Sequence, residues 1–482
     1  MTDVIDLVRA QAEARPGHPA LVVDAREGAT QLSYAELVAR MEARAVALRA
    51  AGLEPAERCG LLARQGAGFV EAALAILAAG ACFVPIPDDT AGAALERFQR
   101  EARLHALVEE AQDFALRRLP PPEPLPGQGE AEFRELRPAY LRFTSGTTSR
   151  RKGVIVGHAA ILARLEHANA GLAIGPDDRV LWLLPMAHHF LVSILLYLRF
   201  GATILLPASS LARAVLELAG REEATVFYAS PFHYALLGKD ASRLGLPRVR
   251  LAVSTAEGLR AEVARRFAER FGRPLVQALG VIEVGLPVMN VASAANKPEA
   301  LGRPLPGYEV WLRGEDGRPV EGPGSPERSG EICIRGPGLF DAYLEPWTPA
   351  RAVLQPDGFR TGDQGFFDAD GDLFLAGRRS NRINMAGMKF FAEEVEAVLE
   401  QHPSVSRARV HSRTHPHLGE IPVAEVVPAD PARPPERAAL LAHCRAQLPA
   451  YKIPREIAFV AELATTVTGK VRRWDDEAAP RA

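Results

Sequence analysis

The sequence alternates between short apolar runs and longer amphipathic stretches, and this alternation limits the possible folds more than any other feature. Residues 59–63 (CGLLA) and 82–86 (CFVPI) have the length and composition of buried strands. Residues 68–80 (GFVEAALAILAAG), which lie between them, are typical of a helix. Strands that alternate with helices favour α/β layers over an all-α or all-β fold. We therefore expect β-sheets flanked by helices.

The same alternation continues along the chain. A helix is expected to begin near His158, because Ile161, Leu165, Ala168 and Leu172 recur at spacings of four, three and four residues. A hairpin is expected to turn at residues 370–371 (DG), and residues 411–420 (HSRTHPHLGE) are expected to form a polar loop. Further strands are expected at residues 139–143, 154–156, 225–230, 308–313 and 330–336, and further helices at 36–52, 261–272, 391–405 and 437–448.

The character of the sequence changes after residues 377–382 (GRRSNR). The chain beyond that point has an amphipathic helix, strands, a second helix and the segment 453–463, which together are typical of a small α+β domain. We place a boundary near Ser380. The expected architecture is a large multi-layer N-terminal domain over residues 1–379 and a small, mobile α+β C-terminal domain over residues 380–482.

Composition excludes several classes of function. The net charge is −2, so the bulk charge does not indicate a nucleic-acid partner or an anionic membrane surface. The four cysteines lie far apart and form no CxxC pair, which is typical of a reducing compartment. The most apolar stretch, residues 190–207, is interrupted by Arg199 and Gly201, so it predicts a buried helix and strand rather than a membrane span. We expect a cytoplasmic protein without a signal peptide.

Residues 144–153 (TSGTTSRRKG) combine hydroxyl side chains, two glycines and three cations between two expected strands. A Walker A loop would need a glycine before the lysine and a helix after it, whereas here Arg151 precedes Lys152 and a strand follows. A strand–loop–strand of this composition can still hold phosphate with hydroxyls, backbone N–H groups and a lysine. A polar hairpin tip with surface cations explains these ten residues equally well.

The ten residues resemble the signature T-S-G-T-T-[GS]-x-P-K-G-V of the adenylate-forming superfamily, which includes acyl-CoA synthetases, aryl-CoA ligases, adenylation domains and luciferases. Seven other stretches resemble further motifs of that superfamily, and all eight follow its order. These stretches are LAAGACFVPI (77–86), PMAHHF (185–190), LGVIEVG (279–285), GEICIRG (330–336), FRTGDQG (359–365), GRRSNRINMAGMKFFAEEVE (377–396) and TVTGKVRR (466–473).

The resemblance implies a role for each matching residue. Glu283 would bind Mg²⁺, Asp363 would accept from the ribose hydroxyls, and Arg378 would help to fix the nucleotide. Lys470 would bridge the substrate carboxylate and the α-phosphate of ATP, and His188 would stand between the carboxylate and thiol tunnels. Phosphopantetheine would enter beside Gly387 after the small domain rotates. The phosphates of ATP would be bound by Thr144, Ser145, Gly146, Thr147, Thr148 and Lys152.

The chain departs from the superfamily pattern at four places. Ile282 replaces the threonine beside the metal carboxylate, and loss of a hydrogen bond to a charged group costs roughly 1.5–3 kcal/mol. Arg151 replaces the signature proline, and Ser380 replaces the acidic hinge residue. The glycine-rich turn at the adenine pocket has the sequence STAEGL (254–259), which places Glu257 near the adenine or the acyl group.

The resemblance implies an acyl- or aryl-CoA ligase that uses ATP, Mg²⁺ and coenzyme A. No acidic residue lies between Arg179 and Ser210 to pair with an α-ammonium group, so we expect a carboxylic acid without an α-amino group. Three alternatives remain open. The chain could load a carrier protein, it could have lost adenylation and only thioesterify a supplied acyl-adenylate, or it could bind adenylates without catalysis.

Overall fold

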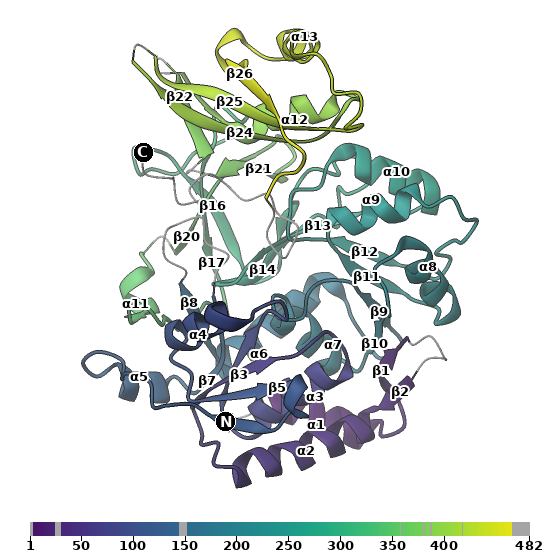
Figure 1. The fold of residues 1–482 in the computed structure, drawn as a ribbon, viewed down its shortest axis with the longest axis vertical. Coiled ribbons are helices and arrows are strands. Elements are labelled where there is room, and N and C mark those ends of the chain that lie inside the picture. Colours follow the sequence, from purple (N-terminus) through teal and green to yellow (C-terminus); the bar gives the residue numbers. More distant parts are fainter. Residues whose placement is uncertain are drawn as a thin grey trace. The chain divides into compact units, whose positions relative to one another are not determined.

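The computed structural model describes residues 3–24, 30–143, 152–356, 358–378, 381–385, 388–416 and 418–464 (Figure 1). Internal contacts divide these residues into two compact units. The larger unit contains the described residues up to 143 together with residues 152–308 and 336–356, and the smaller unit contains the described residues of 309–335 and 358–464. Ser380 lies outside the described residues, so the domain boundary near it stays a prediction.

The larger unit has two sheets among its described residues. One has the strand order β19-β18-β8-β7-β4-β3-β5-β6, and its central strands β7, β4, β3 and β5 are parallel. These strands are buried on both faces, as parallel strands between helices must be. Their bounds are β3 Arg58–Leu62, β4 Cys82–Ile86, β5 Ala106–Glu109, β6 Leu116–Arg118, β7 Pro138–Phe143, β8 Gly153–Gly157, β18 Ala342–Tyr343 and β19 Thr348–Pro349.

The other sheet of the larger unit has the strand order β15-β14-β13-β12-β11-β9-β10-β1-β2. Strands β1, β10, β9, β11, β12 and β13 run parallel, and the edge strands pair in the antiparallel sense. The bounds are β1 Pro19–Val23, β2 Thr30–Ser33, β9 Arg179–Trp182, β10 Thr203–Leu206, β11 Val226–Ala229, β12 Leu251–Ser254, β13 Val276–Val281, β14 Gly285–Met289 and β15 Arg303–Pro304.

Helices cover both sheets, and α6 contacts an element of each. Helix α6 packs against β8 of the first sheet and β14 of the second. The helices of this unit are α1 Val4–Ala14, α2 Tyr34–Ala50, α3 Ala67–Ala78, α4 Gly92–Glu101, η1 Glu110–Gln112, α5 Gly129–Glu135, α6 His158–Leu172, η2 Phe190–Leu195, α7 Leu196–Arg199, α8 Ala212–Arg221, α9 Pro231–Lys239, α10 Ala261–Phe271 and α11 Ala350–Val353.

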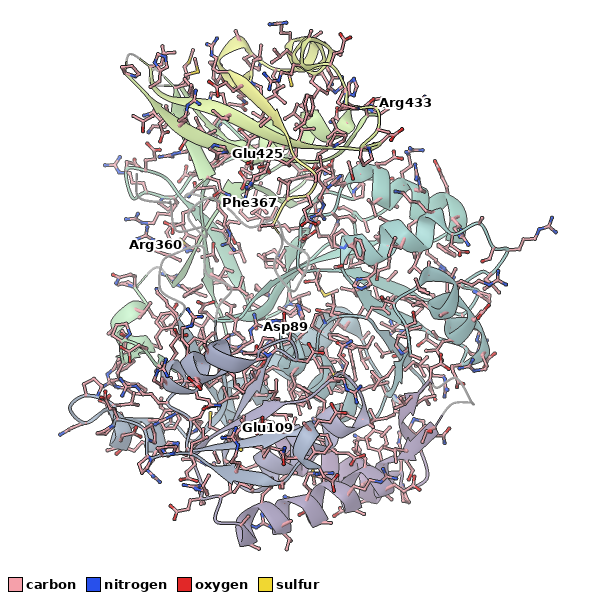
Figure 2. The ribbon with its side chains drawn as sticks, viewed as in Figure 1. Asp89, Glu109, Arg360, Phe367, Glu425 and Arg433 are labelled. Carbon is pink, nitrogen blue, oxygen red and sulfur yellow. The ribbon has the colours of Figure 1, made fainter. Side chains whose placement is uncertain are left out.

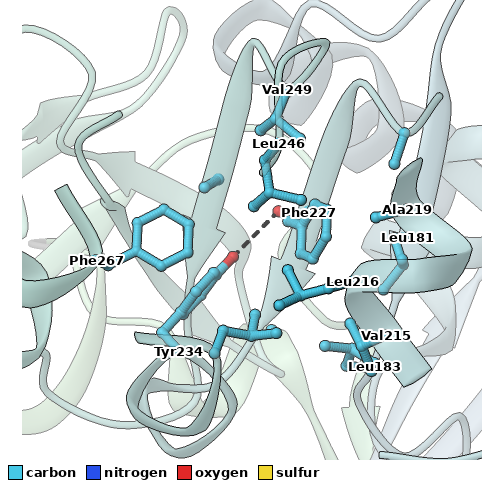
Figure 3. Packing of buried hydrophobic residues seen from close by; sticks show 14 of the residues in the cluster. Leu181, Leu183, Val215, Leu216, Ala219, Phe227, Tyr234, Leu246, Val249 and Phe267 are labelled. Atoms are coloured by element: carbon cyan, nitrogen blue, oxygen red, sulfur yellow. Dashed lines mark hydrogen bonds between the residues drawn. The ribbon is translucent and has the colours of Figure 1, made fainter. Parts of the chain in front are cut away.

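One hydrophobic core joins strands β9 to β12 to helices α8, α9 and α10, which lie beside them (Figure 1). Leu216 and Phe227 are fully buried at its centre (Figure 3). The Tyr234 hydroxyl lies in the same core and donates to the carbonyls of Val253, at 2.8 Å, and Phe227, at 3.3 Å, the latter drawn as a dashed line in Figure 3. The Tyr234 side chain can lie in this apolar core because its hydroxyl group is hydrogen-bonded.

The described part of the smaller unit contains two sheets of its own. The four-stranded sheet has the order β16-β17-β20-β21, and the five-stranded sheet joins β23, β22, β25 and β24, with β26 paired to β25. Helix α12 packs on β24 and α13 packs on α12. The bounds are β16 Glu309–Arg313, β17 Gly330–Arg335, β20 Phe359–Phe367, β21 Leu373–Arg378, β22 Arg382–Met385, β23 Met388–Phe391, α12 Ala392–Gln401, β24 Val405–His415, β25 Gly419–Pro428, α13 Arg437–Gln447, η4 Ala450–Lys452 and β26 Glu456–Phe459.

Ion pairs link neighbouring strands of the smaller unit. Arg360 on β20 lies 2.5 Å from Glu331 on β17, and Arg409 on β24 lies 2.6 Å from Glu425 on β25. Figure 2 labels Arg360 and Glu425, one residue of each pair. Both carboxylates are largely buried, so each pair places its charges where water screens them little. Cross-strand pairs of opposite charge help to fix the strand register.

The predicted α/β architecture is confirmed, and so are the individual elements at 59–86, 138–143, 153–172 and 203–206. The hairpin at residues 370–371 is also confirmed, with Gly371 at φ +82° between β20 and β21. The polar loop expected at 411–420 was wrong. Residues 405–415 and 419–428 form the long antiparallel strands β24 and β25, which pair as far as His415 and Gly419. Their ends are polar because the outer part of the hairpin is largely exposed.

Among the described residues no helix is both long enough and apolar enough to cross a membrane. The four cysteines are Cys59, Cys82, Cys333 and Cys444; all of them are buried, and none forms a disulfide. Burial raises the pKa of Cys82 to about 12 and that of Cys444 to about 11. These thiols therefore stay protonated at neutral pH and act as small apolar side chains.

We predict that Leu216→Ala destabilises the protein by about 2–5 kcal/mol, because it removes a fully buried side chain and leaves a cavity. Leu211→Ala is the matched control, since Leu211 precedes the same helix and is 70% exposed, and it should change stability by no more than about 0.5 kcal/mol. The measurement is the midpoint of urea unfolding for both variants. Equal shifts of the two midpoints would show that this core does not determine stability.

We also predict a pH-dependent contribution from His105. Its Nδ1 accepts from the Arg58 backbone N–H at 3.1 Å, and burial, helped by the Arg58 charge, lowers the pKa of His105 from 6.5 to about 4. Because the unfolded state binds the proton more readily, the stabilisation is complete above pH 6.5 and is lost as the pH falls towards 4.

The test compares the unfolding free energy of the wild type with that of His105→Asn, whose amide oxygen can still accept the hydrogen bond. The difference between the two proteins should be constant above pH 6.5 and should change steadily below it. A difference that does not depend on pH between 7 and 4 would contradict the prediction.

Candidate functional site

Glu283 lies in the short turn that joins β13 to β14. The turn is closed by the Val284 N–H, which donates to the Val281 carbonyl at 2.9 Å. This places the Glu283 side chain in the interior of the larger unit, where it is only 8% exposed. A carboxylate in such a position needs hydrogen-bond donors or a cation.

Tyr343 supplies one such donor from β18. Its hydroxyl donates to Glu283 Oε1 at 3.0 Å, and the tyrosine is itself buried. Burial, the neighbouring charge of Glu283 and the hydrogen bond to it all raise the pKa of Tyr343 far above its usual value. The phenol therefore keeps its proton and stays a donor to the carboxylate over the whole physiological pH range.

Lys152 extends this arrangement at the start of β8. Its Nζ lies 4.6 Å from the centroid of the Tyr343 ring, within the range of a cation–π contact. The contact follows from strand pairing, because Tyr343 on β18 lies opposite Val154 on β8. Lys152, Tyr343 and Glu283 thus form a continuous polar chain, although they are far apart in the sequence.

The surroundings of Glu283 fit a divalent cation. Within the described ranges its carboxylate has no ion pair, and its hydrogen-bond partner is the neutral Tyr343 hydroxyl. The same ranges hold no group of three or more His, Cys, Asp or Glu that could bind a metal without help. Mg²⁺ is commonly held by one or two carboxylates together with phosphate oxygens. Glu283 could therefore hold Mg²⁺ only jointly with a phosphorylated ligand.

His188 lies in the turn between β9 and η2. Its N–H donates to the Pro185 carbonyl at 3.0 Å, and the Arg142 guanidinium donates to the His188 carbonyl. The side chain is half-buried. The neighbouring His189 packs edge-on against Trp182 at a centroid distance of 6.3 Å. The backbone of the turn is thus fixed from two sides, and the predicted role of His188 stays a prediction.

The turn at 254–259 follows strand β12. Ala256 has φ +77°, the left-handed conformation that favours glycine. Thr255 Oγ1 donates to the Ala278 carbonyl at 3.0 Å, and the Leu259 N–H donates to Gln277 Oε1 at 2.5 Å. The turn therefore keeps a glycine-like backbone in a sequence without glycine at that point, because side-chain hydrogen bonds hold both of its ends.

Asp363 and Arg378 lie in the smaller unit and face each other across β20 and β21. The Arg378 Nε is 3.1 Å from Asp363 Oδ1, and the Asp363 N–H donates to Thr361 Oγ1 at 3.1 Å. Asp363 is largely buried, whereas Arg378 is 44% exposed. The structure therefore brings these two predicted nucleotide residues together, and their roles towards a nucleotide stay predictions.

Several predicted site residues lie outside the described residues, and their roles also stay predictions. They are Thr144, Ser145, Gly146, Thr147 and Thr148 of the phosphate loop, Gly387 and Lys470, together with the divergent Arg151 and Ser380.

Two residues of the site were not identified from the sequence. Tyr343 lies sixty positions from Glu283, so its hydrogen bond depends on the pairing of β18 with β8. Arg164 is buried on α6 beside the predicted apolar face, and it donates to the carbonyls of Ile282 and Glu283. The only sequence signal was a charged residue at the edge of an apolar helix face.

Comparison with known proteins agrees with this geometry. The model of the AMP-binding enzyme family matches residues 8–344, and the model of the AMP-binding enzyme C-terminal domain matches residues 394–470. The chain therefore belongs to the AMP-binding enzyme family, within the adenylate-forming superfamily. The resemblance found in the sequence motifs is confirmed.

The chain is similar to sulfoacetate–CoA ligase of Cupriavidus necator, with 32% identity over 74% of this chain and 67% of that protein. It is 29% identical to a feruloyl-CoA synthase of Amycolatopsis over 93% of this chain and 94% of that protein. Among solved structures it resembles the anthranilate CoA ligase AuaEII in complex with anthranoyl-AMP, with a TM-score of 0.82, 25% identity, and coverage of 98% and 96% of the two chains. The two-domain fold expected from the sequence is confirmed.

We predict that Tyr343→Phe lowers acid-dependent ATP–pyrophosphate exchange about 10- to 100-fold. The Glu283 carboxylate would lose a hydrogen bond that is worth roughly 1.5–3 kcal/mol. Tyr140→Phe is the matched control, because that buried hydroxyl has no hydrogen-bond partner within the described residues. The exchange rate of Tyr140→Phe should stay within about twofold of the wild type, and an equal loss in both variants would refute the role of Tyr343.

Proposed function

We propose that the chain is an AMP-forming acid–thiol ligase. It activates a carboxylic acid with ATP and Mg²⁺ as an acyl-adenylate, and it then transfers the acyl group to coenzyme A. The observation that carries this proposal is the connected set of polar side chains Lys152, Tyr343 and Glu283 in a member of the AMP-binding enzyme family. The similarity to CoA ligases that act on sulfoacetate, ferulate and anthranilate supports the choice of thiol.

In this mechanism each of the named site residues helps to bind or orient one part of ATP. Glu283 would hold Mg²⁺ together with the phosphates of ATP, and Tyr343 orients the Glu283 carboxylate. When bound, Mg²⁺ neutralises charge that develops on the phosphates. Lys152 presents its ammonium group next to the same position, beside the residues of the phosphate loop. In the smaller unit Asp363 accepts from the ribose hydroxyls, while Arg378 fixes the orientation of Asp363 and of the nucleotide.

The covalent chemistry needs a positive charge between two anions. Lys470 supplies it by bridging the substrate carboxylate and the α-phosphate, so that a carboxylate oxygen attacks phosphorus and pyrophosphate leaves. The small domain beyond Ser380 then rotates and withdraws Lys470. Phosphopantetheine enters beside Gly387 and past His188, and its thiol displaces AMP from the acyl carbon.

The acid substrate lacks an α-amino group. Residues 180–209 contain no acidic side chain, and they form β9, η2, α7 and β10, which are mostly buried. Trp182 of this region stacks on Tyr228 of the neighbouring strand β11, with ring centroids 5.2 Å apart, and Tyr197 packs edge-on against both rings. Such surroundings suit an aryl or acyl group and would leave an ammonium group without a counter-charge.

A second candidate function is an enzyme that thioesterifies a supplied adenylate but adenylates slowly. The observation in its favour is Ile282, which places an apolar side chain beside Glu283 where the superfamily has a threonine hydroxyl. A carrier protein could replace coenzyme A as the acceptor in either case. We place the reaction in the cytoplasm, because none of the four cysteines forms a disulfide.

A panel of carboxylic acids separates these functions. ATP–pyrophosphate exchange measures adenylation, and synthetic acyl-adenylates supplied with coenzyme A or a carrier protein measure thioester formation. A complete CoA ligase shows both activities. Thioester formation without exchange would overturn the complete CoA ligase in favour of the second candidate. Exchange with transfer only to a carrier protein would overturn the choice of coenzyme A.

We predict that Lys470→Ala abolishes exchange, with a loss of about a hundredfold or more, and largely spares thioester formation from a supplied adenylate. A charge-assisted contact to the reacting phosphate is worth several kcal/mol in the transition state of the first step only. The two rates are measured side by side on the same preparation. Equal loss of both rates would contradict the role of Lys470.

A further inference from the structure

Arg164 is a fully buried arginine in the middle of helix α6. It is 1% exposed, and burial lowers its pKa to about 10, so it keeps its charge at neutral pH. Burying a charge without compensation costs several kcal/mol. Apart from His158 at its first position, the other buried residues of helix α6 are apolar, so the presence of this charge requires a specific explanation.

The guanidinium group donates to three backbone carbonyls. Nε donates to Gly338 at 2.5 Å, Nη1 to Ile282 at 2.8 Å, and Nη2 to Glu283 at 2.9 Å. The Glu283 carbonyl also accepts from the Phe340 N–H at 2.7 Å. Arg164 and Phe340 therefore fix the main chain of Glu283, while Tyr343 fixes its side chain.

Two glycines shape the space around the arginine stem. A Cβ atom on Gly338, which has φ +69°, would lie 2.7 Å from both the Ala160 carbonyl oxygen and Arg164 Cγ. A Cβ atom on Gly285, which has φ +110°, would lie 3.2 Å from the same Cγ. The backbone therefore approaches Arg164 from the turn that carries Glu283 and from the turn before Phe340.

The geometry requires an arginine in particular. Three different nitrogen atoms of one rigid, planar group each reach a different carbonyl. A lysine offers one tetrahedral nitrogen on a flexible stem, so it cannot bond to all three carbonyls at once. The carbonyls belong to two separate turns, so the arginine ties these turns together.

We propose that Arg164 is a positioning residue for the magnesium site. It holds the main chain of Ile282 and Glu283 in the conformation that presents the Glu283 carboxylate to the metal and its phosphates. This inference rests on the proposed function.

The test uses Arg164→Lys and Arg164→Met, with Arg58→Lys as the matched control. Arg58 is equally buried, and it donates to the Arg103 carbonyl at 2.8 Å and to Glu130 at 2.9 Å, so its replacement also disturbs a buried hydrogen-bond network. Binding of Mn²⁺ with ATP is measured by electron paramagnetic resonance in the absence of any acid. Exchange is measured against Mg²⁺ concentration, and thioester formation is measured from a supplied adenylate.

For both Arg164 variants we expect Mn²⁺–ATP binding to weaken about 10- to 100-fold, and the Mg²⁺ concentration for half-maximal exchange to rise by the same factor. Thioester formation per folded molecule should stay within about twofold of the wild type. For Arg58→Lys all three quantities should stay near the wild type once they are corrected for the folded fraction, measured by circular dichroism.

Two outcomes would overturn the inference while leaving the proposed function intact. One is unchanged Mn²⁺–ATP binding in Arg164→Lys, and the other is an equal loss of both half-reactions in the Arg164 variants. A wild-type protein that binds no Mn²⁺–ATP and catalyses no exchange would overturn the proposed adenylation, and the role of Arg164 with it.

Discussion

The buried carboxylate of Glu283 is the constraint on which the candidate site depends. A carboxylate with 8% exposure is stable only if its surroundings replace the water that it has lost. The larger unit supplies the Tyr343 hydroxyl from β18 and the Lys152 ammonium group, which lies over the Tyr343 ring. It also supplies the Arg164 guanidinium group, which donates to the main-chain carbonyl of Glu283. Each of these groups comes from a different part of the chain, so the site exists only when the whole unit is folded.

Helix α6 connects the two sheets that supply these groups. It packs against β8 and β14. Lys152 directly precedes β8, and Glu283 lies just before β14. Arg164 lies on the same helix and bonds to the turn of Glu283. The apolar residues of α6 fix the distance between the sheets, and its single buried cation fixes the local backbone. Packing and electrostatics therefore act through one element.

The order of strands and helices could be predicted from the sequence, because apolar periodicity is local. The motifs also identified Glu283, Lys152, and the pair Asp363 and Arg378, since each lies in a motif at or next to a strand. The contacts of Tyr343 and Arg164 could not be predicted, because they depend on strand pairing and helix packing over distances of more than fifty residues. The hairpin of residues 405–428 was missed in part because its outer end lacks the apolar alternation by which strands are recognised.

The burial of all four thiols has a practical consequence for the study of this protein. Cys59, Cys82, Cys333 and Cys444 are buried, and burial raises the pKa of the first two and of Cys444. A disulfide reagent such as Ellman's reagent reacts with thiolates, and the native chain offers it almost none. The consumption of free coenzyme A can therefore be followed continuously with this colour reagent in the presence of the folded enzyme. Any slow background colour would report unfolding.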